Sequence, residues 1–210
     1  SGLPRVEEVF ENRTPKNPAI ISHVDGVITD IIKNGNDKMI VILPDVESKV
    51  KDKIEYEVNA ARMVLVKKGD SVKKGDMLTD GSADIDELFK YAGKEAAQNY
   101  IIREIAKPYE LQGEAVSRKH IEVIVKQMFS RRKVRDAGST ELTRGDIVEG
   151  GDFLLTNADR RNAGTEEAKA DQVLMGITEV SLSRKSFLSA ASFQHTTRIL
   201  IAAAIRGVDD

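Results

Sequence analysis

Two stretches of this chain follow the same ten-residue pattern, G-D-x-V-x-x-G-D-x-L, one beginning at Gly69 and the other at Gly145. Each copy predicts a short strand between two Gly-Asp turns, with the Val and the final Leu buried. Paired turns of this kind recur in small barrel-sandwich folds. The repeat therefore predicts β structure on both sides of the residues that separate the two copies.

The residues before the first copy also predict strands. Short aliphatic runs lie between residues 19 and 66, and Asn34-Gly35 is a hairpin turn signal between two of them. The charged stretch 47–53 is most simply a solvated hairpin tip. We therefore expect a β-rich module over residues 16–82.

Helical periodicity dominates the residues between the two copies. Asp84 with Glu87 makes a capping-box-like start, and apolar residues follow at helical spacing. A second helix is expected over residues 94–107, because Pro108 should stop it. These patterns predict two consecutive helices directly after the first β-rich module.

A third helix is predicted after Ser117. It ends in three basic residues that also complement the helix dipole, Arg131, Arg132 and Lys133. The helical segment then spans residues 83–135, and a second β-rich piece follows over residues 136–175. Within that piece residues 156–172 are polar and weakly patterned, so we expect an irregular loop there.

The two ends of the chain have patterns of their own. Residues 3–13 predict a short amphipathic helix. Residues 176–200 form a serine-rich segment, with five serines from Ser181 to Ser192, and small polar side chains of this kind let another chain approach closely. A helical pattern follows it. The expected fold is α+β, with two β-rich, barrel-sandwich-like halves flanking a helical middle, and with a C-terminal helix.

The composition excludes several functional classes. The absence of cysteine excludes disulfides, thiolate zinc sites and cysteine nucleophiles, and is compatible with a reducing cytoplasm. No apolar run approaches membrane-spanning length, and no signal segment opens the chain. His23, His120 and His195 lie far apart without a ligand partner at metal spacing. We therefore predict no catalytic residue, no cofactor and no metal site in this chain.

The charge balance allows DNA contact only through local basic clusters. The formal net charge is -2, which gives no global attraction to nucleic acid. Basic clusters anchor phosphates without sequence preference. The candidates for DNA contact are Lys73, Lys74, Arg131, Arg132, Lys133, Arg184 and Lys185. A solvated turn or a dipole-matched helix end is the competing interpretation of each cluster.

Three stretches of the chain resemble the C-terminal part of the β′ subunit of bacterial RNA polymerase. They are residues 2–11 (GLPRVEEVFE), Leu111-Gln-Gly113 with residues 119–128 (KHIEVIVKQM), and residues 176–200, where that family reads roughly GITKASLxxxSFxSAASFQETTRVL. The resemblance implies a non-catalytic portion of a DNA-directed RNA polymerase, a nucleotidyltransferase whose catalytic Mg²⁺ is bound elsewhere. It implies the β and ω subunits, the rest of β′ and downstream double-stranded DNA as partners, in the cytoplasm.

The resemblance also implies a role for each part of the chain. Residues 1–15 would follow the mobile trigger loop, residues 16–82 would form a jaw-like module, and residues 176–210 a switch-like segment with the C-terminal helix. The switch-segment candidates are Thr178, Ser181, Ser192, Gln194, Thr196, Thr197 and Arg198. Glu179 and His195 depart from the family, which usually has Lys and Glu at these positions.

Two other functions stay open at this point. One is a free-standing scaffold or adaptor built on β′-like parts. The other is a biotinyl or lipoyl carrier domain, because Asp25-Gly26-Val27 precedes a V-x-x-G-D-x-V-x-x-G-D-x-L stretch over residues 66–78. Such carriers need a lysine in a Met-Lys-Met or Asp-Lys-Ala setting, and this sequence contains neither.

Overall fold

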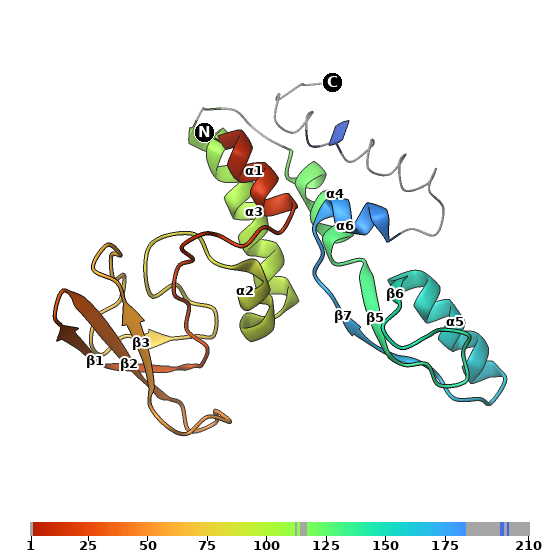
Figure 1. The fold of residues 1–210 in the computed structure, drawn as a ribbon, viewed down its shortest axis with the longest axis horizontal. Helices are drawn as coiled ribbons and strands as arrows, with labels where there is room; N and C mark the ends of the chain where they lie inside the picture. The colour runs from red at the N-terminus through yellow and green to blue at the C-terminus, as the bar shows by residue number, and fades with distance from the viewer. Residues whose placement is uncertain (1, 112, 114–116, 184–197, 200, 202–210) are drawn as a thin grey trace. The chain divides into compact units, whose positions relative to one another are not determined.

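The computed structural model describes residues 2–111, 113, 117–183, 198–199 and 201 (Figure 1). The chain divides into two compact units. The central unit is Thr14–Asn99, and the split unit combines Ser1–Arg13 with Tyr100–Asp210. Both units contain helices and strands, so the predicted α+β class is confirmed.

A four-stranded antiparallel sheet in the order β3-β2-β1-β4 forms the central unit. Its strands are β1 (Gly26–Asn34), β2 (Asp37–Pro44), β3 (Ile54–Val58) and β4 (Ser71–Val72). Asn34 pairs with Asp37, so the predicted hairpin turn is confirmed, with Gly35 at a positive φ of 66°. The charged residues between β2 and β3 are largely exposed, as predicted for a solvated tip.

Hydrophobic side chains of the sheet and of the residues beside it form the core of the central unit. The buried cluster consists of Val24, Ile28, Ile40, Ile42, Tyr56, Val58, Val72 and Leu78. The expected strands near residues 19–21 and 63–66 form only isolated bridges, Ile21 with Met77 and Val64 with Thr79. The first repeat copy therefore behaves as predicted, since its Val and final Leu both lie in this core.

Three helices follow the sheet in sequence: α2 (Ile85–Ala92), α3 (Lys94–Leu111) and α4 (Arg118–Met128). The predicted cap of α2 is confirmed, because the Asp84 side chain accepts from the N–H groups of Asp86 and Glu87. The predicted stop at Pro108 is wrong, because α3 continues to Leu111. Pro108 removes one backbone hydrogen bond, and burial of Ile105 and Tyr109 on either side of it favours the extra turn.

In the split unit, α1 (Gly2–Phe10) packs near α4, with Val6, Val9 and Phe10 buried. The amphipathic N-terminal helix is therefore confirmed. The half-buried Arg5 pairs with Glu8 at 3.0 Å and with Glu104 of α3 at 3.2 Å. Burial opposes the charge of Arg5, but the hydrogen bond to Glu8, the nearby Tyr100 and the contacts with Glu104 outweigh it, so its pKa is raised.

The remaining elements of the split unit are two helices and the three strands of an antiparallel sheet in the order β6-β5-β7. They are β5 (Arg131–Asp136), β6 (Ile147–Glu149), α5 (Gly150–Asn162), β7 (Lys169–Gln172) and α6 (Ile177–Leu182). The predicted helix end at residues 131–133 is wrong, since these residues begin β5. Helix α4 stops at Met128, and β5 then pairs with a strand on each side.

The predicted irregular loop over residues 156–172 is also wrong, because it contains most of α5 and all of β7. Only Phe153 and Asn157 of α5 are buried, so its sequence has almost no apolar stripe. Asn157 Nδ2 donates to the Ala168 carbonyl at 2.9 Å, and Ala168 N–H donates to Asn157 Oδ1 at 2.7 Å. A buried amide therefore holds the start of β7 where the sequence suggests only polarity.

The second repeat copy forms only in part: its first Gly-Asp turn and the strand β6 are as predicted, but α5 takes the place of the second turn. Its final Leu154 lies on α5 and is 58% exposed, and Val148 is only half-buried. Glu149 caps α5 by accepting from the Asp152 N–H at 2.9 Å, so the second Gly-Asp pair begins a helix. Arg198 has helical backbone and is exposed, and the rest of the predicted C-terminal helix lies almost entirely outside the described residues.

Candidate nucleic-acid interface

Three four-residue turns share one design, Lys67–Asp70, Lys73–Asp76 and Thr143–Asp146. In each, the Asp N–H donates to the carbonyl of the first residue at 3.0 or 3.1 Å. The Asp carboxylate accepts the N–H of that first residue in return, at 2.8 or 2.9 Å. The third residue is a glycine with φ between 88° and 95°. Each turn is closed in both directions and is therefore rigid.

These turns display cations. The second position of the three turns is occupied by Lys68, Lys74 and Arg144, all exposed. Lys67 and Lys73 occupy the first position of two turns and are also exposed. Among the described residues, none of these five side chains makes an ion pair. The predicted candidates Lys73 and Lys74 thus lie on a fixed backbone with their ammonium groups in solvent.

The Lys73–Asp76 turn is held to the sheet by a further contact. Lys74 N–H donates to Asp25 Oδ1 at 2.8 Å, immediately before β1. Gly75 N–H donates to the Ser22 carbonyl at 2.8 Å. This turn is therefore anchored at its centre as well as at its ends.

The second predicted cluster is dispersed by strand geometry. Arg131 is 4% exposed, and its Nε donates to Ser183 Oγ at 3.0 Å. The Arg132 guanidinium lies over the Phe153 ring, 5.7 Å from its centroid. Lys133 is exposed. Alternation along β5 would place Arg131 and Lys133 on one face, but Arg131 is buried and Lys133 is exposed, so these three cations do not form one phosphate-binding patch.

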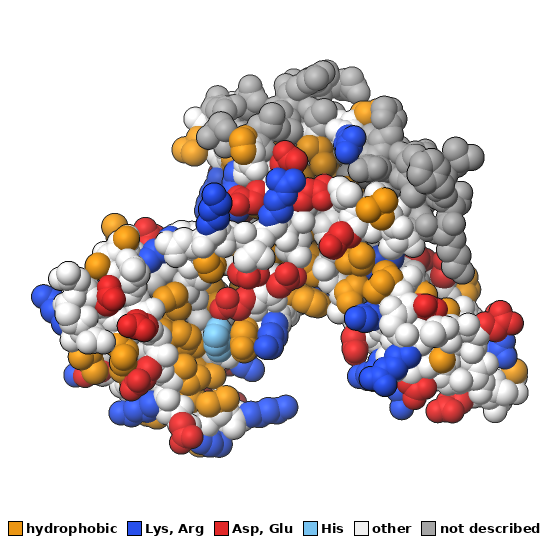
Figure 2. Space-filling view, viewed as in Figure 1, with side chains coloured by type: hydrophobic (Ala, Val, Ile, Leu, Met, Phe, Trp, Pro, Cys, Tyr) orange, Lys and Arg blue, Asp and Glu red, His pale blue; other side chains and the backbone are white. Residues whose placement is uncertain are grey.

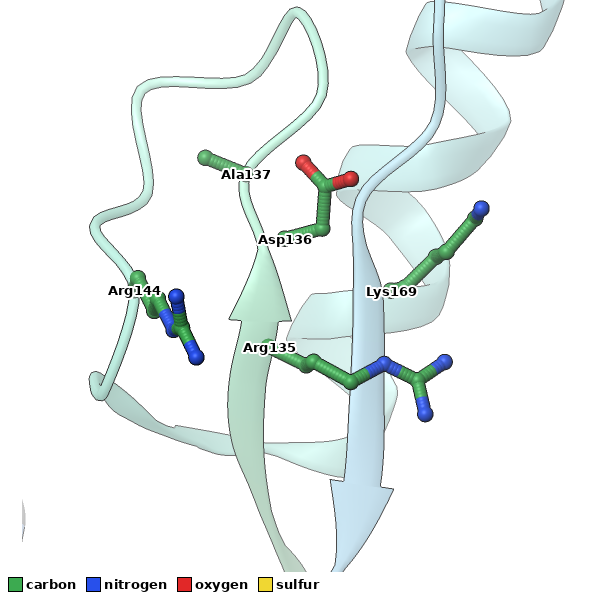
Figure 3. A pocket seen from close by; sticks show the side chains of 5 residues that line it. All are labelled: Arg135, Asp136, Ala137, Arg144 and Lys169. Atoms are coloured by element: carbon green, nitrogen blue, oxygen red, sulfur yellow. The ribbon is translucent and has the colours of Figure 1, made fainter.

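A third group of basic residues was not predicted. Arg135, Arg144 and Lys169 line a pocket of about 610 Å³ together with Asp136 and Ala137 (Figure 3). Arg144 has a sequence signal, because it occupies the second position of a Gly-Asp turn. Arg135 belongs to the basic run that begins at Arg131, but nothing in the sequence indicates that it meets Lys169, since only the pairing of β5 with β7 brings them together. On the face drawn in Figure 2, basic and acidic side chains are interspersed over both units, consistent with small local clusters.

The described part of the serine-rich segment is α6 and its flanks. Thr178 Oγ1 donates to Glu11 Oε1 at 2.8 Å, and Thr178 N–H donates to Glu11 Oε2 at 3.3 Å. Ser181 is fully buried and donates to the Thr178 carbonyl at 2.8 Å. A Cβ added at Gly176 would lie 2.5 Å from the Glu11 carbonyl oxygen. The start of this segment therefore sits directly on the residue that follows α1.

Most of the other segment candidates lie outside the described residues, namely Arg184, Lys185, Ser192, Gln194, Thr196 and Thr197. Arg198 is described and exposed. Thr178 and Ser181 are the candidates that the structure brings together. Both make contacts inside the split unit.

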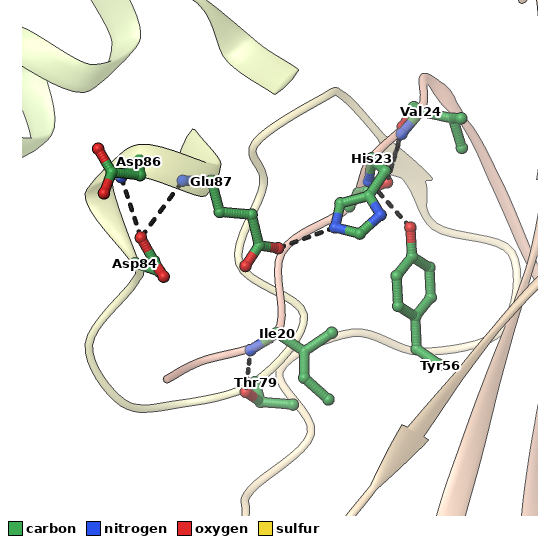
Figure 4. A network of polar contacts seen from close by, with 9 residues as sticks. Ile20, His23, Val24, Tyr56, Thr79, Asp84, Asp86 and Glu87 are labelled. Atoms are coloured by element: carbon green, nitrogen blue, oxygen red, sulfur yellow. Dashed lines mark hydrogen bonds and ion pairs between the residues drawn. The ribbon is translucent and has the colours of Figure 1, made fainter. Parts of the chain in front are cut away.

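A polar network around His23 lies in the central unit (Figure 4). His23 Nε2 and Glu87 Oε1 are 2.8 Å apart, and the His23 ring stacks on Tyr91 with centroids 3.9 Å apart. His23 N–H donates to the Tyr56 hydroxyl at 2.9 Å. Burial raises the pKa of Tyr56. The network joins the residues before β1 to α2, and nothing in its sequence spacing predicted it.

The described residues contain no group of three His, Cys, Asp or Glu side chains placed to hold a metal ion. No helix among them is both long enough and apolar enough to cross a membrane.

Comparison with known proteins gives one consistent result. The model of a family described as RNA polymerase Rpb1, domain 5, matches residues 7–185. The chain is 44% identical over 209 residues to the DNA-directed RNA polymerase subunit beta' of Natranaerobius thermophilus. It is 42% identical over 209 residues to that of Rickettsia massiliae and 41% identical over 211 residues to one from Neisseria meningitidis. These matches cover all of this chain but only 15% to 17% of the relatives.

Proposed function

Since the chain belongs to the family described as RNA polymerase Rpb1, domain 5, we propose that it is a non-catalytic part of the β′ subunit of a DNA-directed RNA polymerase. In this role it supports transcription by holding downstream double-stranded DNA. Its protein partners are the β and ω subunits and the rest of β′. We propose that other parts of the polymerase bind the catalytic Mg²⁺ of the nucleotidyltransferase.

One observation carries the DNA-binding part of the proposal: the two consecutive lysine turns of the central unit. They place Lys67, Lys68, Lys73 and Lys74 on either side of the short strand β4, all exposed and without ion pairs among the described residues. Ammonium groups on a fixed backbone bind phosphates with less loss of conformational freedom than those on a flexible loop. Contacts of this kind are independent of base sequence, as a polymerase that moves along DNA requires.

The contact between Glu11 and Thr178 supports the proposed switch role of residues 176–210. A carboxylate accepting both the hydroxyl and the backbone N–H of Thr178 fixes the beginning of the segment to the end of α1. By the resemblance, α1 follows the trigger loop. We propose that Arg184 and Lys185 supply, further along the segment, the positive charge that Glu179 removes.

Removal of the lysine-bearing module tests this function. A polymerase would be assembled with a β′ subunit in which a short linker replaces residues 16–82. RNA synthesis is measured on a template that ends at the active site and on one that carries a downstream duplex. We expect synthesis on the short template to persist and retention of the downstream duplex to fall. Loss of synthesis on the short template contradicts the non-catalytic assignment, and undiminished duplex retention contradicts the DNA role.

A further inference from the structure

We propose that the pocket lined by Arg135, Arg144 and Lys169 in the split unit is a phosphate-binding site. The phosphate would come from a nucleic-acid backbone or from a free oligophosphate, and the two sources share the chemistry that the pocket recognises. The site lies in a different unit from the lysine turns. It goes beyond the proposed function, because it stands even if those turns do not touch DNA.

The charge of the pocket favours an anion. Three exposed cations come from three different segments, β5, the Thr143–Asp146 turn and β7 (Figure 3). The lining contains one carboxylate, Asp136, whose Oδ1 already accepts the Gly138 N–H at 3.0 Å. Cations gathered without an equal number of acids repel one another, and a bound anion relieves that repulsion.

The cations of the pocket are only partly neutralised within the protein. Arg135 pairs with Asp171 at 3.2 Å, but both side chains are more than half exposed, so the pair is weak. Among the described residues, neither Arg144 nor Lys169 takes part in an ion pair. Two guanidinium groups and one ammonium group together suit phosphate, because planar guanidinium forks bind phosphate oxygens in pairs.

The backbone around the pocket is fixed. Ser139 N–H donates to the Glu166 carbonyl at 2.9 Å, which fastens the loop after β5 to the segment before β7. Gly138 sits so close to that segment that an added Cβ would lie 2.4 Å from the Glu167 carbonyl oxygen. Lys169 is paired in register with Asp136 on β5. The backbone segments that carry Arg135 and Lys169 are therefore held together without a ligand, which reduces the backbone entropy lost on binding.

The test uses the 210-residue chain with inorganic pyrophosphate, in buffer without divalent cations, and with a short DNA duplex. Pyrophosphate binding is measured by calorimetry and duplex binding by fluorescence anisotropy. We expect saturable binding that Arg144→Ala and Lys169→Ala each weaken about 3- to 10-fold. Lys126→Ala, which removes an exposed cation from α4 outside the pocket, is the matched control and should bind like the parent chain.

The two ligands separate the possible sources. Pyrophosphate binding that depends on Arg144 and Lys169, with duplex binding unaffected, assigns the site to a free oligophosphate. Duplex binding that depends on them, with no pyrophosphate binding, assigns it to a nucleic-acid backbone. Binding of neither ligand, or equal losses in Arg144→Ala, Lys169→Ala and Lys126→Ala, overturns the proposal. The binding of both ligands is also measured for a Lys73→Ala/Lys74→Ala chain, so that any contribution of the lysine turns is separated from that of the pocket.

Discussion

The lysine turns of the central unit and the basic residues of β5 in the split unit look alike in sequence and differ in space. Lys73 and Lys74 are adjacent on a closed turn and are both exposed. Arg131 is buried, Arg132 lies over Phe153, and only Lys133 of that run is exposed. The closed turn leaves both lysines in solvent, whereas β5 pairs with a strand on each side and places its three cations in three different environments. Backbone geometry therefore decides whether a basic run forms a phosphate-binding surface.

The largest effect is expected from substitutions that disrupt a lysine turn. Gly69 and Gly75 occupy the same position in the two lysine turns, but an added Cβ meets open space at Gly69 and lies 2.6 Å from Ala92 Cβ at Gly75. We expect Gly69→Ala to cost about 1–2 kcal/mol, from its positive φ alone. Gly75→Ala should cost about 1–3 kcal/mol more, because the new methyl group overpacks against α2.

Urea unfolding of the two variants measures that difference. Equal free energies of unfolding for Gly69→Ala and Gly75→Ala would contradict the close packing of the second turn on α2.

The next largest loss of stability is expected from a substitution in strand β5. Arg131→Ala removes a buried side chain that hydrogen-bonds to Ser183 Oγ, so we expect a loss of about 2 kcal/mol in the free energy of unfolding. Lys133→Ala removes the same charge from an exposed position two residues on and should stay within about 0.5 kcal/mol of the parent chain. Thermal unfolding of both variants tests this. Similar losses would mean that Arg131 is not a structural residue.

A smaller effect is expected at the start of the serine-rich segment. Thr178→Val keeps the shape of the side chain but removes the hydroxyl that donates to Glu11, and should cost about 1 kcal/mol. Thr178→Ser keeps the hydroxyl and is the matched control. Chemical denaturation of the two chains provides the measurement. Equal stability of the Thr178→Val and Thr178→Ser chains would contradict a stabilising role for the hydrogen bond from Thr178 to Glu11.

The sequence is informative where structure depends on local chemistry. The Asn34-Gly35 hairpin, the Asp84 cap and the first Gly-Asp repeat are each specified within about ten residues, and all three form as predicted. The whole-chain similarity to β′ subunits also agrees with the resemblance of the three motifs. No observation in the structure favours the adaptor or the carrier domain.

Prediction fails where a polar residue has a distant partner. Asn157 suggests a loop by its residue type, yet its amide satisfies both backbone groups of Ala168 and so joins α5 to the residue before β7. Arg131 suggests a helix end, yet it is buried against a residue 52 positions along the chain. The pocket cations Arg135 and Lys169 meet only through strand pairing. Such contacts have no short-range sequence period, because tertiary packing creates them.

The salt dependence of DNA binding tests the central claim most directly. In an assembled polymerase that carries this chain, the affinity for downstream duplex is measured against salt concentration for Lys73→Ala/Lys74→Ala and for the control Lys49→Ala/Lys53→Ala, which removes two exposed lysines from the loop between β2 and β3. We expect the log–log slope to become shallower by roughly 1 to 2 for the turn variant and to stay unchanged for the control. Identical slopes for the turn variant and the parent polymerase would contradict a phosphate-binding role for the lysine turns.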